Sequence, residues 1–432
     1  MEIKKIKVEK DTIGQLLENL LKRSPSQYGS FQEVVDEVIE DVRTNGDDAL
    51  IRLTQKFDQV SLTPETMKVT EEEIKAAYHE LDENLIRVLK RSAERIRDFH
   101  QRQVRNTWMD THENGVILGQ RVMPIDDVGI YVPGGNAPLA SSVLMNVIPA
   151  KVAGCKRIAM ATPPGDQGKV PATILVAADI AGATEIYKVG GAQAIAALAY
   201  GTETIPKVNK VCGPGNIFVA LAKKSVYGLV GIDSIAGPSE VMVLADETAN
   251  PKYVAADLLS QAEHDPLASA ILVTTEESLA DQVAAYMNEF TEKLSRKEII
   301  EQSISNYGYL LIAKDLDEAI EIANEIASEH LEIATAEPFQ VMTKIKNAGA
   351  MFLGEYSCEP LGDYMAGPNH VLPTNGTAKF FSPLSVDDFI KKSSILSFSK
   401  EGMEELAQDV MTFANAESLT AHANSIAVRL EK

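Results

Sequence analysis

The chain has 432 residues, more than one hydrophobic core usually organises, so we expect two or more domains. Its formal charge of −21 disfavours nucleic-acid and anionic-membrane partners, which would repel it, and mildly favours a small cationic substrate. The sequence has no apolar run of about 18 residues to span a membrane and no apolar secretory signal at its start, so we expect a cytoplasmic protein.

The first part of the chain is predicted to be helical. Residues 1–30 are expected to form a mostly polar N-terminal arm. Apolar residues at i, i+3, i+4 and i+7 within residues 31–106 predict long amphipathic helices. His79, His100 and His112 lie among charged residues, and we expect all three at the surface.

From Ile117, short apolar runs alternate with helical segments, which is typical of a parallel sheet in an α/β domain. The turns GGNAP, GGAQA and GPGNI each follow an apolar strand and begin a helix, so a ligand crevice is expected at the carboxyl ends of these strands. Their backbone N–H groups suit a pyrophosphate. None of these turns is the G-x-G-x-x-G fingerprint, no acidic residue follows at the usual distance, and tight βα turns explain the glycines equally well.

A second strand–helix series begins near residue 269 with SAILVTTE and continues with GYLLIAK and AMFLG. We therefore predict an α/β fold of two Rossmann-like parallel-sheet domains with helical N-terminal and C-terminal extensions. The predicted parts are the arm at 1–30, a main domain at 31–127 plus 238–382, an inserted domain at 128–237, and a helical tail at 383–432.

Residues 250–266 predict a helix that Asn250 caps and that ends before Asp265-Pro266. Gln261 and His264 lie three residues apart on one face of its last turn, so a carboxamide oxygen and an imidazole are side by side. Such a pair can supply two ligands to one metal ion. Taken alone, it fits a solvent-facing helix end better.

Residues 315–335 are predicted to form a second helix with an apolar stripe. His330 continues that stripe, which places it inward at the helix C-terminus beside Glu329. A buried core histidine is one interpretation. The other is a general base paired with a water-activating acid.

The last two candidate segments lie near the C-terminus. Residues 361–374 hold Asp363 and His370 in a Gly/Pro-rich loop, and Asp363 could complete an N/O metal set with the helix-end pair. Glu417 and His422 flank the start of the last helix but do not share a face, and a solvated helix end explains them on pattern alone.

Several segments together resemble the histidinol dehydrogenase family over nearly the whole chain and in the family's order. They are IYVPGGNAPLASSVLM, VGGAQAIAALAYGT, CGPGNIFV, AGPSEV, LLSQAEHD, ASEHLEI, GDYMAGPNHVLPT and AESLTAHANSI. The one departure is Asp265, where the family commonly has Gly. The resemblance implies an aldehyde-dehydrogenase-like architecture and the last step of histidine biosynthesis. In that step two NAD⁺ oxidise L-histidinol to L-histidine through L-histidinaldehyde, with one Zn²⁺ per site.

The resemblance also implies roles for individual residues. Glu329 and His330 would be catalytic, with Glu329 activating the water that hydrates the aldehyde. The implied zinc ligands are Gln261, His264, Asp363 and His422. The implied substrate contacts are these four together with Ser239, His330, His370 and Glu417, and the implied dinucleotide contacts are Tyr131, Gln193 and Asn216. The family is a homodimer whose C-terminal tail enters the partner's site, so Glu417 and His422 would act in trans.

Two other enzyme classes stay open on the sequence. An aldehyde-dehydrogenase-like enzyme would use Cys155 or Cys212 as its nucleophile. Cys155, Cys212 and Cys358 lack metal-site spacing, however, and lie in or beside apolar segments that favour inert thiols. A zinc-dependent hydrolase would use Glu329 as its base. A non-catalytic metal-binding protein leaves Glu329, His330 and Glu417 unexplained.

Overall fold

The computed structural model describes residues 3–9, 12–23, 29–134, 138–235 and 237–431. The chain divides into two compact units, one formed by Met1–Gln103 and Ile125–Phe389 and the other by Val104–Pro124 and Ile390–Lys432. Among the described residues, no helix is long and apolar enough to cross a membrane.

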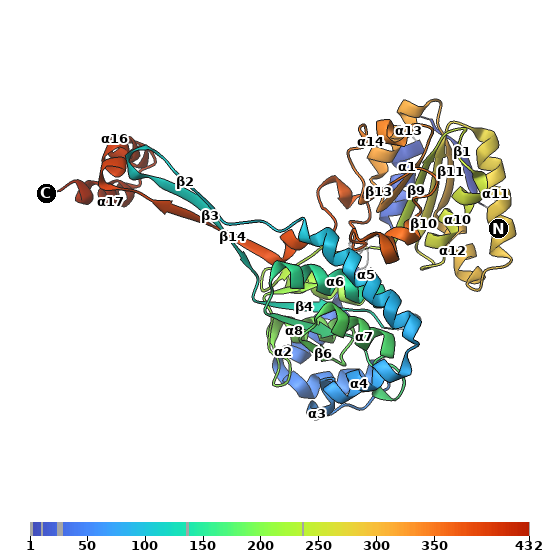
Figure 1. The fold of residues 1–432 in the computed structure, drawn as a ribbon, viewed down its shortest axis with the longest axis horizontal. Coiled ribbons are helices and arrows are strands. Elements are labelled where there is room, and N and C mark those ends of the chain that lie inside the picture. The colour runs from blue at the N-terminus through green and yellow to red at the C-terminus, as the bar shows by residue number, and fades with distance from the viewer. Residues whose placement is uncertain (1–2, 10–11, 24–28, 135–137, 236, 432) are drawn as a thin grey trace. The chain divides into compact units, whose positions relative to one another are not determined.

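The first unit contains a six-stranded sheet, here called sheet A, in which every strand is parallel to its neighbours. In spatial order its strands are β1 (Lys4–Lys7), β11 (Gly308–Ile312), β10 (Ser269–Thr274), β9 (Glu240–Ala245), β12 (His330–Ala334) and β13 (Ala350–Leu353). The helices α10 (Pro251–Ala262), α11 (Glu277–Thr291) and α12 (Lys297–Tyr307) cover one face. The helices α1 (Thr12–Leu21), α13 (Leu316–Ile326) and α14 (Pro338–Met342) cover the other (Figure 1).

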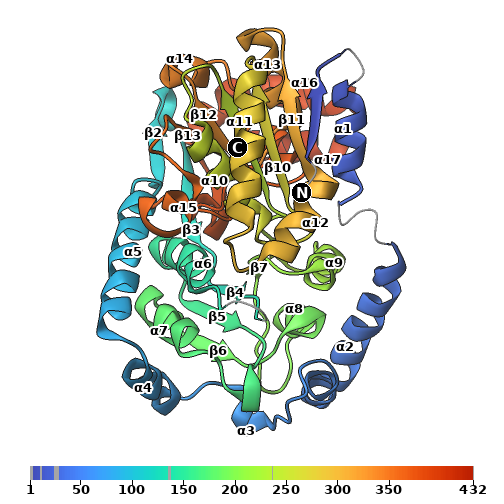
Figure 2. The ribbon, with the colours of Figure 1, turned by 90° about the vertical axis from the view of Figure 1, so that its right-hand side faces the viewer.

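Sheet B, also in the first unit, has five parallel strands. Their order is β6 (Glu185–Tyr187), β5 (Arg157–Ala161), β4 (Asp127–Tyr131), β7 (Lys210–Cys212) and β8 (Gly231–Ile232). One face carries α2 (Gly29–Phe57), α3 (Pro64–Met67), α8 (Gly191–Tyr200) and α9 (Ile217–Val226). The other carries α4 (Glu71–Glu80), α5 (Glu83–Gln101), α6 (Ala140–Ala153) and α7 (Ala172–Ala181), and Figure 2 shows the two layers on opposite sides of the strands.

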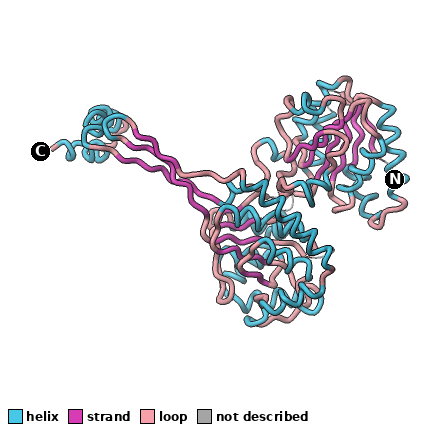
Figure 3. Tube along the Cα trace, in the orientation of Figure 1, coloured by secondary structure: helices cyan, strands magenta, loops and turns pink. Residues whose placement is uncertain are grey.

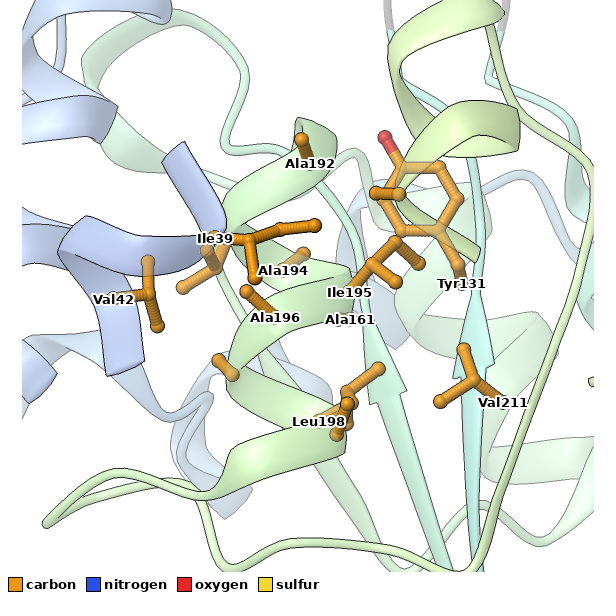
Figure 4. Close-up of a cluster of buried hydrophobic side chains, with 14 of the residues drawn as sticks. Ile39, Val42, Tyr131, Ala161, Ala192, Ala194, Ile195, Ala196, Leu198 and Val211 are labelled. Carbon is orange, nitrogen blue, oxygen red and sulfur yellow. The ribbon is translucent and has the colours of Figure 1, made fainter. Parts of the chain in front are cut away.

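Alternating side chains explain why helices cover both faces of sheet B. Tyr131 and Ala161 point to the α2–α8–α9 side, where they join the cluster in Figure 4. Ile130 and Met160, one residue earlier on each strand, join the core under α6 and α7. A strand with two buried faces needs apolar residues at every position, which is the pattern that predicted a parallel sheet.

The second unit is built on an antiparallel sheet with the order β14 (Ile390–Ser397), β3 (Ile117–Pro124) and β2 (Trp108–Thr111). The helices α16 (Lys400–Ala416) and α17 (Thr420–Leu430) pack on each other, and Figure 3 distinguishes these strands from these helices by colour. Only short apolar side chains of the helices are buried here, namely Ala407, Ala414 and Ala423.

The predicted α/β fold with two parallel sheets is confirmed, with four corrections. The N-terminal arm contains strand β1, which pairs with β11 through backbone hydrogen bonds that its polar sequence does not indicate. Helices α2, α4 and α5, which we assigned to the 238–382 half, cover sheet B instead, because an amphipathic face does not specify its partner. Within the tail predicted to be helical, Ile390–Ser397 form strand β14 instead. Residues 315–335 form helix α13 followed by strand β12.

Candidate active site

Most of the predicted metal and catalytic residues gather at the amino ends of the strands of sheet A. His330 is the first residue of β12 and pairs with Val241 of the neighbouring β9. Gln261 lies in the last turn of α10, the helix that leads from β9 into β10. The C-terminus of a helix that returns to a parallel strand lies at the strand's amino end, so these segments meet at one edge.

His330 is a buried histidine in which one ring nitrogen makes a hydrogen bond and the other does not. Its Nδ1 lies 2.9 Å from the carbonyl oxygen of Glu240, and because a carbonyl only accepts, Nδ1 carries the proton. Nε2 is therefore the unprotonated nitrogen, and it is buried without a hydrogen-bond partner among the described residues. Burial lowers the pKa of His330 to about 4, so the imidazole is neutral at pH 7.

Glu329 is anchored to Glu240, the residue that also binds His330. Its Oε2 accepts a hydrogen bond of 2.9 Å from the backbone N–H of Glu240, while the Nδ1 of His330 binds the carbonyl of Glu240. Burial raises the pKa of Glu329 well above its usual range, and the negative charges of Glu240 and Asp363 raise it further. A carboxyl group and a neutral imidazole are thus held by one residue, and their role as an acid–base pair stays a prediction.

His264 forms a candidate metal centre with two carboxylates. One ligand atom from each of His264, Glu359 and Asp363 lies within 4.8 Å of the others. The Nδ1 of His264 donates to the carbonyl of Ser260 at 3.0 Å, which leaves the Nε2 lone pair available. The Oε1 of Gln261 is buried and has no hydrogen-bond partner among the described residues.

Asp363 is the most acidic group of this cluster. Burial would raise its pKa, but the hydrogen bond from His370 and the electrostatic interactions with His370 and His330 lower it to about 2. The Nδ1 of His370 lies 3.4 Å from Asp363 Oδ1. Glu359 behaves oppositely, because burial and the negative charge of Asp363 raise its pKa to about 8. The surroundings therefore lower the pKa of Asp363 and raise the pKa of Glu359.

Asp363 lies in a short π-helix, Gly362–Ala366, rather than in the loop that we predicted, and this segment is held by helix α5. The hydroxyl of Ser92 donates to the carbonyl of Tyr364 at 2.6 Å. Further along, Asn369 Nδ2 donates to the carbonyl of Met145 at 2.7 Å and lies 3.2 Å from His100 Nε2. His100 is fully buried, so our surface prediction for it is wrong. These contacts tie residues 361–374 to the helices over sheet B.

The remaining substrate-site predictions fall in two places. Ser239 is partly buried immediately before β9, and its carbonyl accepts from the backbone of Ser269 at 3.0 Å. Glu417 and His422 belong to the second unit, where both are exposed: Glu417 is the C-cap residue of α16 and His422 lies in the first turn of α17. Ser418 makes the turn between these helices with a φ of 62°, so the helix breaks between the two residues.

The three predicted dinucleotide contacts line one cavity of about 560 Å³ at the carboxyl ends of sheet B. Tyr131 ends β4 and its hydroxyl accepts from the N–H of Gly191 at 3.1 Å. Gln193 is buried in the first turn of α8, and Asn216 caps α9 through the N–H groups of Phe218 and Val219. The cavity has the size of a small-molecule site and lies where parallel sheets bind ligands. Part of the GGNAP turn, residues 135–137, lies outside the described residues.

The cysteines have the settings of inert thiols. Cys155 and Cys212 are buried, Cys358 is partly buried, and all three are free. Burial raises the pKa of each thiol, that of Cys155 to about 12. A thiolate nucleophile is therefore disfavoured at the positions that the cysteine-dependent alternative requires.

The sequence interpretation missed two acidic residues. Glu359 precedes Asp363 by four residues within a helical turn, and that spacing could have indicated paired carboxylates. Asp58 lines the sheet B cavity but lies directly after α2, far in the chain from the glycine turns. No local pattern connects it with them.

Comparison with known proteins gives a consistent result. A family model described as histidinol dehydrogenase matches residues 21–430. The histidinol dehydrogenase of Clostridium acetobutylicum is 56% identical over 414 residues, which are 96% of each chain. That of Bacillus subtilis is 54% identical over 410 residues, covering 95% of this chain and 96% of the relative. The crystal structure of histidinol dehydrogenase from Elizabethkingia anophelis matches with a TM-score of 0.94 and 40% identity, covering 99% of this chain and 98% of that one.

Proposed function

Because the chain belongs to the histidinol dehydrogenase family, we propose that it oxidises L-histidinol to L-histidine through L-histidinaldehyde, using two NAD⁺ and one zinc ion per site. This reaction is the last step of histidine biosynthesis, and we place it in the cytoplasm. The observation that carries the proposal is the free Nε2 of His330, a buried, neutral base held next to the Asp363–His264 cluster.

The donor set fits zinc. Gln261 Oε1, which is buried without a partner, His264 Nε2 and the ionised Asp363 supply the nitrogen and oxygen ligands that zinc accepts. We assign the fourth ligand to His422. When bound, zinc would orient the amino alcohol and polarise its oxygen, and NAD⁺ would accept the hydride.

The residues of the chain divide the proton transfers between them. In the first oxidation the alcohol loses a hydride from carbon and its hydroxyl proton to His330 Nε2, giving the aldehyde. Water then adds to the aldehyde carbon: the ionised form of Glu329 takes a proton from that water, while protonated His330 returns its proton to the aldehyde oxygen, which gives the hydrate and restores the neutral imidazole. In the second oxidation the hydrate loses a hydride and, again to His330, a hydroxyl proton, giving the carboxylic acid. We assign Ser239, His370 and Glu417 to holding the substrate.

We also propose that the enzyme is a homodimer whose tail completes the partner's site. The second unit exposes large apolar side chains, among them Met109 at 60%, Leu396 at 68% and Phe413 at 70% exposure. A unit with almost no core of its own and this much exposed apolar surface is typical of an obligate interface. A second copy of the chain, covering it, would bring Glu417 and His422 to that copy's cluster.

The first test is NADH formation from L-histidinol and NAD⁺, with and without a chelator. The proposal predicts NADH that is lost with the chelator and restored by zinc. The hydrolase alternative predicts no NADH at all. The cysteine alternative predicts that Cys155→Ala together with Cys212→Ala abolishes turnover, whereas the proposed mechanism retains it.

Zinc binding gives a second readout that does not depend on turnover. Atomic emission on the dialysed protein should give one zinc per chain. His264→Ala and Asp363→Ala should each lose most of that zinc, while His79→Ala, at an exposed histidine outside the cluster, should retain it. Full zinc occupancy in Asp363→Ala would overturn the ligand assignment.

A further inference from the structure

The cavity at the carboxyl ends of sheet B contains one charged side chain that no assignment above uses. Its walls are largely apolar and include Val34, Val38, Phe57, Pro163 and Phe218. Tyr131, Gln193 and Asn216 add uncharged polar groups. Among the described lining residues, Asp58 is the only ionisable group besides Tyr131, and none is a lysine or arginine. Apolar walls suit a flat base, and the polar groups suit the sugar attached to it.

Asp58 has a carboxylate oxygen that no described residue of the protein pairs with. It directly follows α2, and its backbone N–H donates to the carbonyl of Thr54 at 2.8 Å. Its side chain is half-buried, and Oδ2 is buried without a hydrogen-bond partner among the described residues. Burial raises the pKa of Asp58 to about 6, which means that the fold disfavours its charge. An unpaired carboxylate of this kind is destabilising unless a ligand supplies its donors.

A dinucleotide offers such donors in its ribose hydroxyls. In many dinucleotide-binding folds an acidic residue about 20 positions after the glycine turn accepts from the ribose 2′-hydroxyl. The sequence has no acidic residue at that distance, and the structure brings Asp58 to the cavity from the helix layer over sheet B instead. A 2′-phosphate here would meet a carboxylate and no cation on the described walls, so its charge would be repelled.

We propose that Asp58 accepts hydrogen bonds from the adenosine ribose hydroxyls of the bound dinucleotide and thereby selects NAD⁺ over its 2′-phosphorylated form. This inference rests on the proposed function, which puts NAD⁺ in the sheet B cavity. Asp58 is a specificity-determining residue in this account, and it takes no part in the proton transfers at His330.

Calorimetric titration of the full-length protein with ADP-ribose, and with ADP-ribose that carries a 2′-phosphate, tests the inference without any turnover. The wild type should bind ADP-ribose about 100-fold more tightly than the phosphorylated probe. Asp58→Asn should weaken ADP-ribose binding about tenfold, as expected for a lost hydrogen bond to a charged group, and should reduce the preference to about tenfold or less. The matched control is Asp48→Asn, at an exposed residue of α2, the helix that Asp58 directly follows, and Asp48 does not line the cavity.

Steady-state kinetics separate specificity from structural damage. Asp58→Asn should raise the KM for NAD⁺ about tenfold and leave kcat within about twofold, because only cofactor binding is affected. Asp58→Ala provides a second variant if the first folds poorly. An unchanged preference in either folded variant overturns the inference.

The failure of this inference differs from a failure of the proposed function. If the wild type makes NADH from L-histidinol but Asp58→Asn retains the full preference, only the role of Asp58 is wrong. If the wild type makes no NADH and binds neither probe, the cofactor assignment itself is wrong and the role of Asp58 is overturned with it.

Discussion

The imidazole Nδ1 of His330 lies 2.9 Å from the carbonyl oxygen of Glu240, across the β12–β9 strand pair. Glu329 binds the N–H of the same residue at 2.9 Å, so one peptide segment anchors both proposed catalytic groups. Because each side chain is held by backbone rather than by another side chain, its orientation is fixed by the strand pairing itself. These two hydrogen bonds do not use His330 Nε2 or the second carboxylate oxygen of Glu329, so both atoms are available for proton transfer.

Replacement of His330 by Asn tests the proposed base. The Asn amide can still donate to the Glu240 carbonyl, but the Nε2 lone pair is lost. We expect kcat to fall about 10²–10⁴-fold while zinc content and the melting temperature stay close to those of the wild type. Steady-state rates measured beside His79→Asn, an exposed histidine, check this. A loss of less than about tenfold would exclude His330 as the base.

Replacement of Arg23 tests the buried ion pair that Arg23 forms with Glu240. Arg23 Nη2 lies 2.6 Å from Glu240 Oε1, and both side chains are almost fully buried. Arg23→Met leaves the Glu240 carboxylate buried and unpaired, so we expect a loss of about 3–5 kcal/mol in the free energy of unfolding. Denaturant titration should show at most about 1 kcal/mol for Lys344→Met, which breaks the exposed pair with Asp317. Equal effects of the two variants would contradict the buried-pair argument.

The stability of the ligand-free protein should depend on pH through Asp58. Its pKa is about 6 in the folded chain against the unperturbed 3.8, so between these values the folded chain binds more protons than the unfolded chain. Stability therefore falls as pH rises through this window, and the penalty is fully present above about pH 6. Asp58→Asn should melt at a higher temperature than the wild type at pH 7.5, with a difference that vanishes near pH 4. A variant that melts lower at pH 7.5 would show that the carboxylate is paired.

Mixtures of two inactive variants test the exchanged tail. His264→Ala and His422→Ala should each be inactive alone. In refolded mixtures half of the dimers are mixed, and one of their two sites carries both histidines, so about a quarter of the wild-type activity should return. If both histidines belonged to one chain's site, no mixture would recover activity.

The sequence predicted those parts of the fold that depend on local patterns. Continuous apolar runs ending in glycine turns predicted the parallel sheets, and the α10 helix that presents Gln261 begins at its Asn250 cap as expected. The strand β14, with the sequence IKKSSILS, lacks a clear apolar alternation and is set by its pairing with β3. Pairing between distant segments is not visible in local periodicity.

Burial of polar residues was the harder part of the site to predict. His100 lies four residues after the buried Ile96 and continues the buried stripe of α5, yet its charged neighbours suggested the surface. It is buried because Asn369 meets its Nε2 from a loop 269 positions away. Asp58 reaches the sheet B cavity by the same kind of long-range packing. The sequence therefore indicated which residue types form the candidate site, but it did not indicate the distant residues that contact them.

The number of NADH molecules formed per L-histidinol tests the central claim most directly. With limiting L-histidinol and excess NAD⁺, absorbance at 340 nm should give two NADH per substrate, because in the proposed mechanism His330 serves both oxidations and Glu329 activates the water that hydrates the aldehyde between them. Glu329→Gln should give one NADH and release the aldehyde. A yield of one from the wild type, or of two from Glu329→Gln at the wild-type rate, would contradict the division of roles between these two residues.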